Sequence, residues 1–150
     1  MSKIHIILNG ERRSLHVEPN DILLDVIRDK MGAKSPKCGC DRGDCGACTI
    51  FLNGKSVKSC NILAIEADEQ EIVTLEGLSE NGLTKLQEKF INMNSFQCGF
   101  CAPGITIAAT ELLNHNPNPT LDDVKEALSG NLCRCTGYTP ILDAIMSCKK

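Results

Sequence analysis

One short loop, residues 37–49, holds four of the chain's ten cysteines together with three glycines. A segment of this composition cannot bury enough apolar surface to build a core of its own. It can instead wrap a small group that binds thiolates, because glycine lets the backbone approach such a group closely. The fold must therefore present this loop to a bound group, and the function depends on what the cysteines hold.

The spacing of the cysteines in and after this loop is specific. Cys40, Cys45 and Cys48 form a C-x4-C-x2-C pattern, and eleven residues separate Cys48 from Cys60. Plant-type ferredoxins use this spacing, with a more distant fourth cysteine, to bind a [2Fe–2S] cluster. Using Cys38 would lengthen the first gap to six residues, so we interpret it as a spare thiol beside the site. The pattern predicts one cluster bound by the other four cysteines.

A second set of four cysteines lies in two tight pairs. Cys98 and Cys101 form a C-x-x-C pair, and Cys133 and Cys135 form a C-x-C pair after thirty-one intervening residues. Four thiolates that converge between helices can hold Zn²⁺ or an iron–sulfur cluster. A four-cysteine site more often holds zinc, although a C-x-C pair is unusual in zinc ribbons. Spacing by itself leaves the metal open. Cys148 has no partner by spacing and is predicted to be a free thiol.

Two cations flank the first cysteines. Lys37 and Arg42 both lie within the loop. They are open to two interpretations: they offset the negative charge of a thiolate-bound cluster, or they are ordinary solvated charges. The sequence favours neither one.

The beginning of the chain and its composition restrict the compartment and the partners. Residues 1–5 lead into an alternating strand rather than an apolar leader, so we expect a cytoplasmic protein. In a reducing compartment this many cysteines indicate metal binding rather than disulfides. No stretch approaches the roughly twenty apolar residues that span a bilayer. The net charge of −3, with mixed signs and no basic run, gives no indication of nucleic-acid or anionic-membrane binding.

The first half of the chain predicts a small mixed sheet packed on one helix. We expect a helix over 22–31 and strands over 3–8, 12–17, 49–52, 55–59 and 71–75. Asn-Gly pairs at 9–10 and 53–54 predict type I′ hairpin turns. Asn20 or Asp21 is expected to cap the helix, and Gly32 to end it. The order β-β-α-β-β-β places the cysteine loop directly after the helix.

The second half predicts four helices, so the fold class is α+β. Residues 77–82 are polar and rich in glycine, which predicts two domains with bounds 1–77 and 78–150. Beyond them the apolar period becomes helical: Leu83 to Ile91, Pro103 to Leu113, Leu121 to Leu128 and Ile141 to Ile145. A capping box, with Asp123 in place of the usual Glu or Gln, begins at Thr120. Thr139 and Pro140 are expected to cap the last helix.

Three stretches together identify a family. Residues 39–49, 97–104 and 129–138 resemble the iron–sulfur subunit of the molybdenum hydroxylases, the xanthine dehydrogenase and aldehyde oxidoreductase family. The resemblance covers nearly the whole chain. It implies an N-terminal β-grasp ferredoxin-like domain and a C-terminal four-helix domain, each with one [2Fe–2S] cluster. It therefore favours iron over zinc at the second cysteine set.

The resemblance also implies roles for individual residues. Cys98, Cys101, Cys133 and Cys135 match the ligands of the second cluster, while Gln97 and Cys135 match positions that approach the pterin of a molybdenum cofactor. That cofactor belongs to a large molybdopterin-binding partner subunit. The first cluster is expected to face flavin, on a medium FAD-binding subunit. No catalytic residue is assigned, because the chain is implied to be the electron-transfer subunit of an oxidoreductase complex whose substrate chemistry is on a partner chain.

Two other functions fit parts of the pattern. One is a free-standing ferredoxin-like electron carrier with one cluster and a structural zinc site. The other is a redox-sensing scaffold that uses its thiols directly. Metal content separates these functions from a two-cluster relay.

Overall fold

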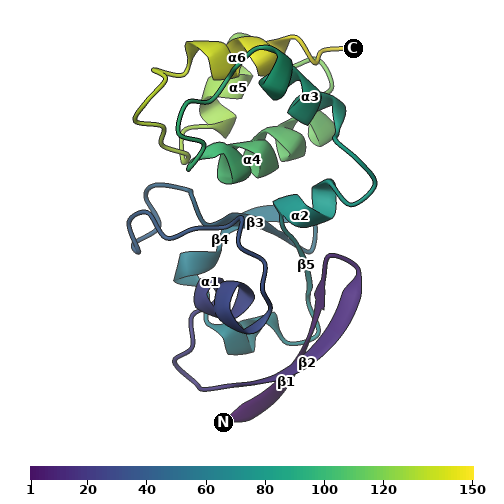
Figure 1. Cartoon of the computed structure of the whole chain (residues 1–150), viewed down its shortest axis with the longest axis vertical. Coiled ribbons are helices and arrows are strands. Elements are labelled where there is room, and N and C mark those ends of the chain that lie inside the picture. Colours follow the sequence, from purple (N-terminus) through teal and green to yellow (C-terminus); the bar gives the residue numbers. More distant parts are fainter.

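The computed structural model covers all residues, 1–150, and stacks a sheet-containing half and a helical half along its longest axis (Figure 1). The N-terminus lies at the free end of the first half, and the C-terminus lies at the far side of the second. One cluster of thirteen buried apolar residues lies within 4–72, and another of eleven lies within 86–148. Each half therefore buries a core of its own.

The first half is a five-stranded mixed sheet. Its strands are β1 (Ser2–Leu8), β2 (Glu11–Val17), β3 (Thr49–Leu52), β4 (Lys55–Lys58) and β5 (Glu71–Val73). The spatial order is β2-β1-β5-β3-β4, in which β1 runs parallel to β5 and the other neighbouring pairs are antiparallel. This is the β-grasp arrangement that the resemblance implied.

Both predicted hairpin turns are confirmed. The φ angles are 50° at Asn9 and 82° at Gly10, and 51° at Asn53 and 81° at Gly54. A type I′ turn needs positive φ at both central residues, and asparagine followed by glycine meets that need at little steric cost. These local preferences fix the register of β1 against β2 and of β3 against β4.

The last predicted strand is shorter than the sequence pattern indicated. β5 ends at Val73, and Leu75 begins the short helix α2 (Leu75–Leu78) instead of continuing the strand. The Asn9 side chain accepts the Thr74 N–H at 2.9 Å and donates to the Thr74 hydroxyl at 2.9 Å. Because these bonds replace sheet partners at Thr74, the chain leaves the sheet there.

The helix after β2 differs from the prediction at its start and in its geometry. It comprises α1 (Leu23–Asp25) and a π-helical turn, η1 (Val26–Lys30). The N-cap residue is Ile22, so the prediction of a cap at Asn20 or Asp21 is wrong. The Leu23 N–H donates to the Ile62 carbonyl oxygen at 2.8 Å. A backbone acceptor from another segment thus satisfies the first helical N–H, and no side-chain cap is needed there.

The apolar face predicted for this helix is buried against the sheet. Leu23, Val26, Ile27 and Met31 belong to the same buried cluster as side chains of β1, β3 and β5. Gly32 ends the helix with a φ of 80°, a conformation that glycine adopts without steric cost. The cysteine loop begins a few residues later, so the core of the sheet half anchors its entry.

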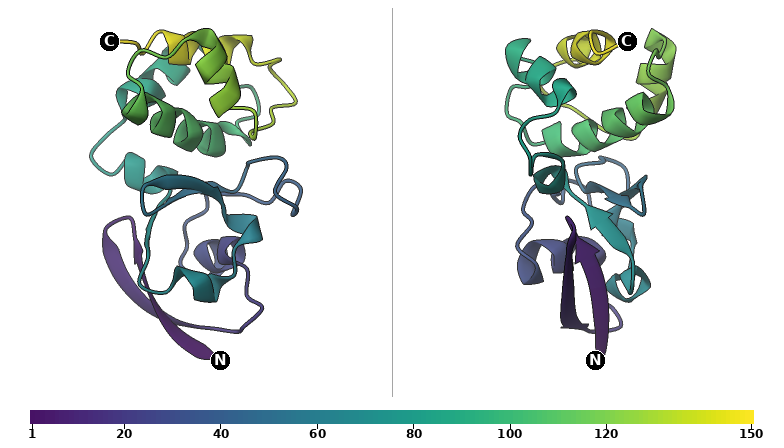
Figure 2. Two further views of the ribbon diagram at one scale, coloured as in Figure 1. Left: turned by 180° about the vertical axis from the view of Figure 1, so that it is seen from behind. Right: turned by 90° about the vertical axis from the view of Figure 1, so that its right-hand side faces the viewer.

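Four helices form the second half, as predicted. They are α3 (Lys85–Asn92), α4 (Ala102–His115), α5 (Leu121–Ala127) and α6 (Thr139–Met146). α4 lies at the junction and contacts β3 and β4, while the other three helices lie on its far side (Figures 1 and 2). None of the chain's helices has the length and apolar character that crossing a bilayer requires.

The two capping predictions in this half have different outcomes. The Thr120 hydroxyl accepts the Asp123 N–H at 3.2 Å, and the Asp123 carboxylate accepts the Thr120 N–H at 2.8 Å, which confirms the box. The predicted cap at Thr139 and Pro140 is wrong, because both lie in the first turn of α6 and Tyr138 is its N-cap residue. Tyr138 has a φ of 74°, so a left-handed residue redirects the chain into the helix.

The apolar face of α3 is narrower than predicted. Leu86 and Phe90 are buried, whereas Leu83 and Ile91 are 52% and 59% exposed. Thr84 caps α3, so Leu83 lies before the helix begins. Ile91 follows Phe90 by one residue, about 100° around the helix, and therefore points away from the stripe that Leu86 and Phe90 share.

We expect Ile141→Ala to lower the free energy of unfolding of the iron-loaded protein by about 2–5 kcal/mol, because the substitution leaves a cavity in the core. Ile141 in α6 is 0% exposed. Ile91→Ala removes the same atoms from the surface and should change the free energy by less than about 0.5 kcal/mol. Urea unfolding followed by circular dichroism measures both variants. Equal effects would contradict the assignment of α6 to the core.

Candidate metal centres

The first cysteine loop projects beside the junction of the two halves, between η1 and β3 (Figures 1 and 2). The backbone is sharply folded there, with φ angles of 58° at Asp41, 82° at Gly43 and 74° at Gly46. The Lys37 N–H donates to the Ala47 carbonyl oxygen at 2.9 Å and closes the loop. Backbone N–H groups are thereby turned towards the space that the loop encloses.

Backbone donors surround the first pair of thiols, Cys40 and Cys45. The Cys40 sulfur accepts N–H groups of Asp44 and Cys45, each at 3.3 Å, and the Cys45 sulfur accepts the Ala47 N–H at 3.4 Å. Hydrogen bonds to the backbone, chiefly to Cys45, lower the pKa of the Cys40 thiol to about 7. N–H donors that stabilise thiolate are the surroundings that metal-ligating cysteines need.

The second pair of the first set is buried. Cys48 and Cys60 are 2% and 7% exposed and pack with Leu24. Cys60 lies in η2 (Ser59–Asn61), a 3₁₀ turn that replaces the predicted last residue of β4. The Ser59 hydroxyl donates to the Cys48 carbonyl oxygen at 2.7 Å, which fixes the two segments together. Burial, and then the neighbouring Cys48 thiol, raise the pKa of Cys60 to about 11.

Cys38 lies outside these pairs. Its thiol is exposed, and no hydrogen bond reaches its sulfur. Gly39 separates it from the site, and a Cβ on Gly39 would lie 2.8 Å from the Cys45 sulfur. A side chain at position 39 would therefore force the Cys45 sulfur to shift. The register that pairs Cys40 with Cys45 is consistent with this geometry.

The second cysteine set also gathers in pairs, and each pair joins two distant segments. The sulfur atoms of Cys98 and Cys135 are 3.6 Å apart, and both residues are exposed. Cys101 and Cys133 are half-buried. Burial, and then the neighbouring Cys133 thiol, raise the pKa of Cys101 to about 12.

This pairing fits the chemistry of a two-iron cluster. Each set offers two pairs of thiols, and each iron of a [2Fe–2S] cluster takes two of its four protein ligands. The residues present therefore fit such a cluster at each set.

The sole tyrosine supports the loop of the second set. The Tyr138 hydroxyl accepts the Cys133 N–H at 2.9 Å and donates to the Asn131 carbonyl oxygen at 2.9 Å. The Thr136 hydroxyl lies 3.1 Å from the Cys133 sulfur. Although burial opposes it, hydrogen bonding from the hydroxyl and backbone of Thr136 lowers the pKa of Cys133. Tyr138 ends the third family stretch, 129–138, but no local pattern predicted this supporting role for its hydroxyl.

Direct hydrogen bonds join the two cysteine loops. The Leu132 N–H donates to the Cys45 carbonyl oxygen at 2.8 Å. The Asn131 amide, only 5% exposed, donates to the Gly46 carbonyl oxygen at 3.2 Å and to the Thr49 hydroxyl at 3.3 Å. The residues just before the C-x-C pair are therefore fixed to the backbone of the first loop.

The halves approach so closely at this point that side chains are excluded. A Cβ on Gly104 would overlap the Gly46 carbonyl oxygen, and a Cβ on Gly46 would overlap the Gly130 carbonyl oxygen. The side of Gly46 that a Cβ would occupy is therefore filled by the helical half, while the close approach of the loop backbone to a bound cluster stays a prediction. Further along the junction, the Ser56 N–H and hydroxyl both donate to the Glu111 carboxylate.

The remaining predicted residues lie at the surface or in the core. Gln97 is exposed and precedes the exposed thiol of Cys98. Cys148 is 7% exposed in the core of the helical half, where burial raises the pKa of its thiol. All ten cysteines are free, so the chain contains no disulfide.

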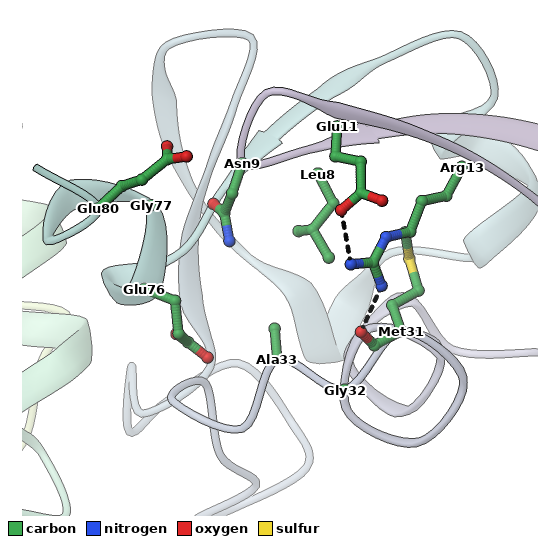
Figure 3. A pocket seen from close by; sticks show the side chains of 10 residues that line it. All are labelled: Leu8, Asn9, Glu11, Arg13, Met31, Gly32, Ala33, Glu76, Gly77 and Glu80. Atoms are coloured by element: carbon green, nitrogen blue, oxygen red, sulfur yellow. Dashed lines mark hydrogen bonds and ion pairs between the residues drawn. The ribbon is translucent and has the colours of Figure 1, made fainter.

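A pocket of about 280 Å³ in the sheet half has no part in either cysteine set (Figure 3). The Arg13 guanidinium on its wall donates to Glu11 at 2.9 Å and to the Met31 carbonyl oxygen at 2.8 Å. Glu76, on the opposite wall, accepts the Ser35 N–H at 3.2 Å. Arg13 and Glu76 are thus both bonded to the protein itself, and no cysteine lines the pocket.

Two family models match the chain, one for each half. The 2Fe-2S iron-sulfur cluster binding domain matches residues 6–81, and the [2Fe-2S] binding domain matches residues 74–146. The two matches include both cysteine sets. They support iron, rather than zinc, at the second set.

Known proteins resemble nearly the whole chain. It is 49% identical over 143 residues to the nicotinate dehydrogenase small FeS subunit of Eubacterium barkeri, covering 95% of this chain and 91% of that protein. It is 39% identical over 150 residues to the xanthine dehydrogenase iron-sulfur-binding subunit of Escherichia coli O157:H7, covering 98% and 94%. The crystal structure of the aldehyde oxidoreductase from Desulfovibrio desulfuricans ATCC 27774 superposes with a TM-score of 0.93 at 43% identity, over 97% of this chain and 17% of that one.

We expect Asn131→Ala to lower the free energy of unfolding by about 1–3 kcal/mol, because its two buried side-chain hydrogen bonds, to the Gly46 carbonyl oxygen and the Thr49 hydroxyl, are lost. Asn118→Ala is the matched control, since Asn118 is exposed in a loop of the helical half. Urea unfolding of the iron-loaded protein measures both. If Asn131→Ala behaved like the control, the buried amide would not hold the two halves together.

Proposed function

Because the chain belongs to the small iron–sulfur subunits of the xanthine dehydrogenase and aldehyde oxidoreductase family, we propose that it relays electrons between a molybdopterin centre on a partner chain and a flavin or other acceptor. It is the electron-transfer subunit of an oxidoreductase complex and carries two [2Fe–2S]-binding domains. The observation that carries the proposal is the presence of two sets of paired thiols, one in each half, whose loops are hydrogen-bonded to each other.

We assign each cluster to one cysteine set. The proposed ligands are Cys40, Cys45, Cys48 and Cys60 for the first and Cys98, Cys101, Cys133 and Cys135 for the second. When bound, the clusters supply one-electron carriers. The chain's own residues supply thiolates, backbone donors such as the N–H groups on Cys40, and burial that keeps water from Cys48 and Cys60. The proposed division of the two domains lies between residues 77 and 78.

The exposure of the thiols supports an orientation within the complex. Cys98, Cys135 and the adjacent Gln97 are all exposed, so this edge is free to face a partner. We assign a large molybdopterin-binding subunit to this edge and place a medium FAD-binding subunit towards the first set. The aldehyde oxidoreductase relative supports a large partner, because the region that matches this chain makes up only 17% of the aldehyde oxidoreductase chain. Assembly in the cytoplasm is consistent with ten free thiols.

Metal analysis of the purified complex tests this function. We expect about four iron atoms and about four acid-labile sulfides per copy of this chain, with negligible zinc, because two [2Fe–2S] clusters are bound. Two iron atoms and one zinc per chain would instead support a one-cluster carrier with a structural zinc site.

Cysteine substitutions test the ligand assignment. We expect Cys135→Ser to abolish or alter the EPR signal of the second cluster and to leave that of the first intact, because the two sets are separate. Cys38→Ser is the matched control: it removes an exposed thiol that accepts no hydrogen bond, and it should leave both signals unchanged. Loss of the first signal in Cys38→Ser would overturn the assigned register.

A further inference from the structure

The side chain of Lys37 leaves the first cysteine loop and lies against the helical half. Its backbone N–H is bonded to Ala47 within the loop, and its ammonium donates to the Ser35 carbonyl oxygen at 3.1 Å. The same ammonium lies 5.4 Å from the centre of the Phe100 ring. Phe100 stands inside the C-x-x-C turn of the second set. A cation that belongs by sequence to the first site is therefore held beside the second.

Phe100 forms the platform for this cation. A Cβ on Gly39 would lie 3.4 Å from the Phe100 ring and 2.8 Å from the Cys45 sulfur, so the ring packs directly over the first loop. An ammonium group near an aromatic ring is attracted by the negative charge of the ring face. Together the ring and the Ser35 carbonyl oxygen restrict where the ammonium can move.

The charge of Lys37 is not cancelled by a directly paired carboxylate. The ion pairs of the chain involve other residues, including the exposed Lys34 with Asp29 at 3.5 Å. Burial, and then Arg28, lower the pKa of Lys37, whereas Glu76 and the thiols of the second set, Cys101 and Cys98, act in the opposite direction. The ring that the ammonium faces belongs to Phe100, which lies between Cys98 and Cys101, so the uncancelled charge stands beside the second set.

We propose that Lys37 is a positioning residue that raises the reduction potential of the cluster bound by the second cysteine set. A [2Fe–2S] cluster with four thiolates is negatively charged, and it gains one more negative charge when it accepts one electron from its donor. A fixed positive charge nearby stabilises the reduced form more than the oxidised form. Because Lys37 belongs to the other half, this effect depends on the docking of the two halves. The inference rests on the proposed function, in which the second set binds a cluster.

An EPR-monitored redox titration of the assembled complex tests the inference. In Lys37→Met we expect the equilibrium between the reduced and oxidised second cluster to shift about threefold to tenfold towards the oxidised form. At about 59 mV per tenfold for one electron, this lowers its reduction potential by about 30 to 60 mV. Lys37→Arg keeps the charge and should retain the original potential. Lys34→Met is the matched control, because it removes an exposed cation from the same stretch and should change neither cluster.

A second variant keeps the test decisive if Lys37→Met does not assemble. Phe100→Leu removes the ring and frees the ammonium, so we expect a smaller shift of the second cluster in the same direction. The role of Lys37 would be overturned if the reduction potential of the second cluster were unchanged in whichever variant assembles. It would also be overturned if the potentials of both clusters shifted equally. The iron and sulfide content of the unsubstituted complex is a separate measurement, and only a one-cluster value there would count against the proposed function itself.

Discussion

The hydrogen bond from the Leu132 N–H to the Cys45 carbonyl oxygen places the two cysteine loops against each other. It is possible only because the two backbones meet at Gly46 and Gly104, where any side chain would overlap the opposite carbonyl oxygen. The buried Asn131 amide finds its acceptors within this contact, in the Gly46 carbonyl oxygen and the Thr49 hydroxyl. Buried polar groups without such partners would oppose docking, so the relative position of the two sites depends on these few bonds.

Each cysteine set contains two pairs of thiols that differ in burial and in hydrogen bonding. In the first set, backbone N–H groups surround Cys40, while Cys60 is buried among apolar side chains. In the second set, one pair is exposed and the other is half-buried, with the Thr136 hydroxyl beside Cys133. Donors favour thiolate and burial disfavours it, which explains why the pKa values of neighbouring thiols diverge. The two irons of each proposed cluster would therefore have different surroundings.

The junction also lets one half act on the chemistry of the other. Lys37 is adjacent to the first cysteines in sequence, yet its ammonium lies over Phe100 of the second set. Tyr138 has a related effect within the helical half, because its hydroxyl links the Cys133 N–H to the Asn131 carbonyl oxygen. Support for the second loop and its attachment to the first thus share one residue, Asn131. Docking and the environment of the second site are coupled through these contacts.

The sequence by itself determined the features that depend on neighbours along the chain. The Asn-Gly turns, the Thr120 capping box and the cysteine spacing act within a few residues, and the family motifs indicated iron at the second set. Only the tertiary structure decided the cap of α1, where a distant carbonyl oxygen replaced Asp21, and the exposure of Ile91. It also decided which thiols pair, where Lys37 points and what Asn131 bonds. These features join residues up to 85 positions apart, so no local pattern encodes them; they exist only after the two cores have formed and docked.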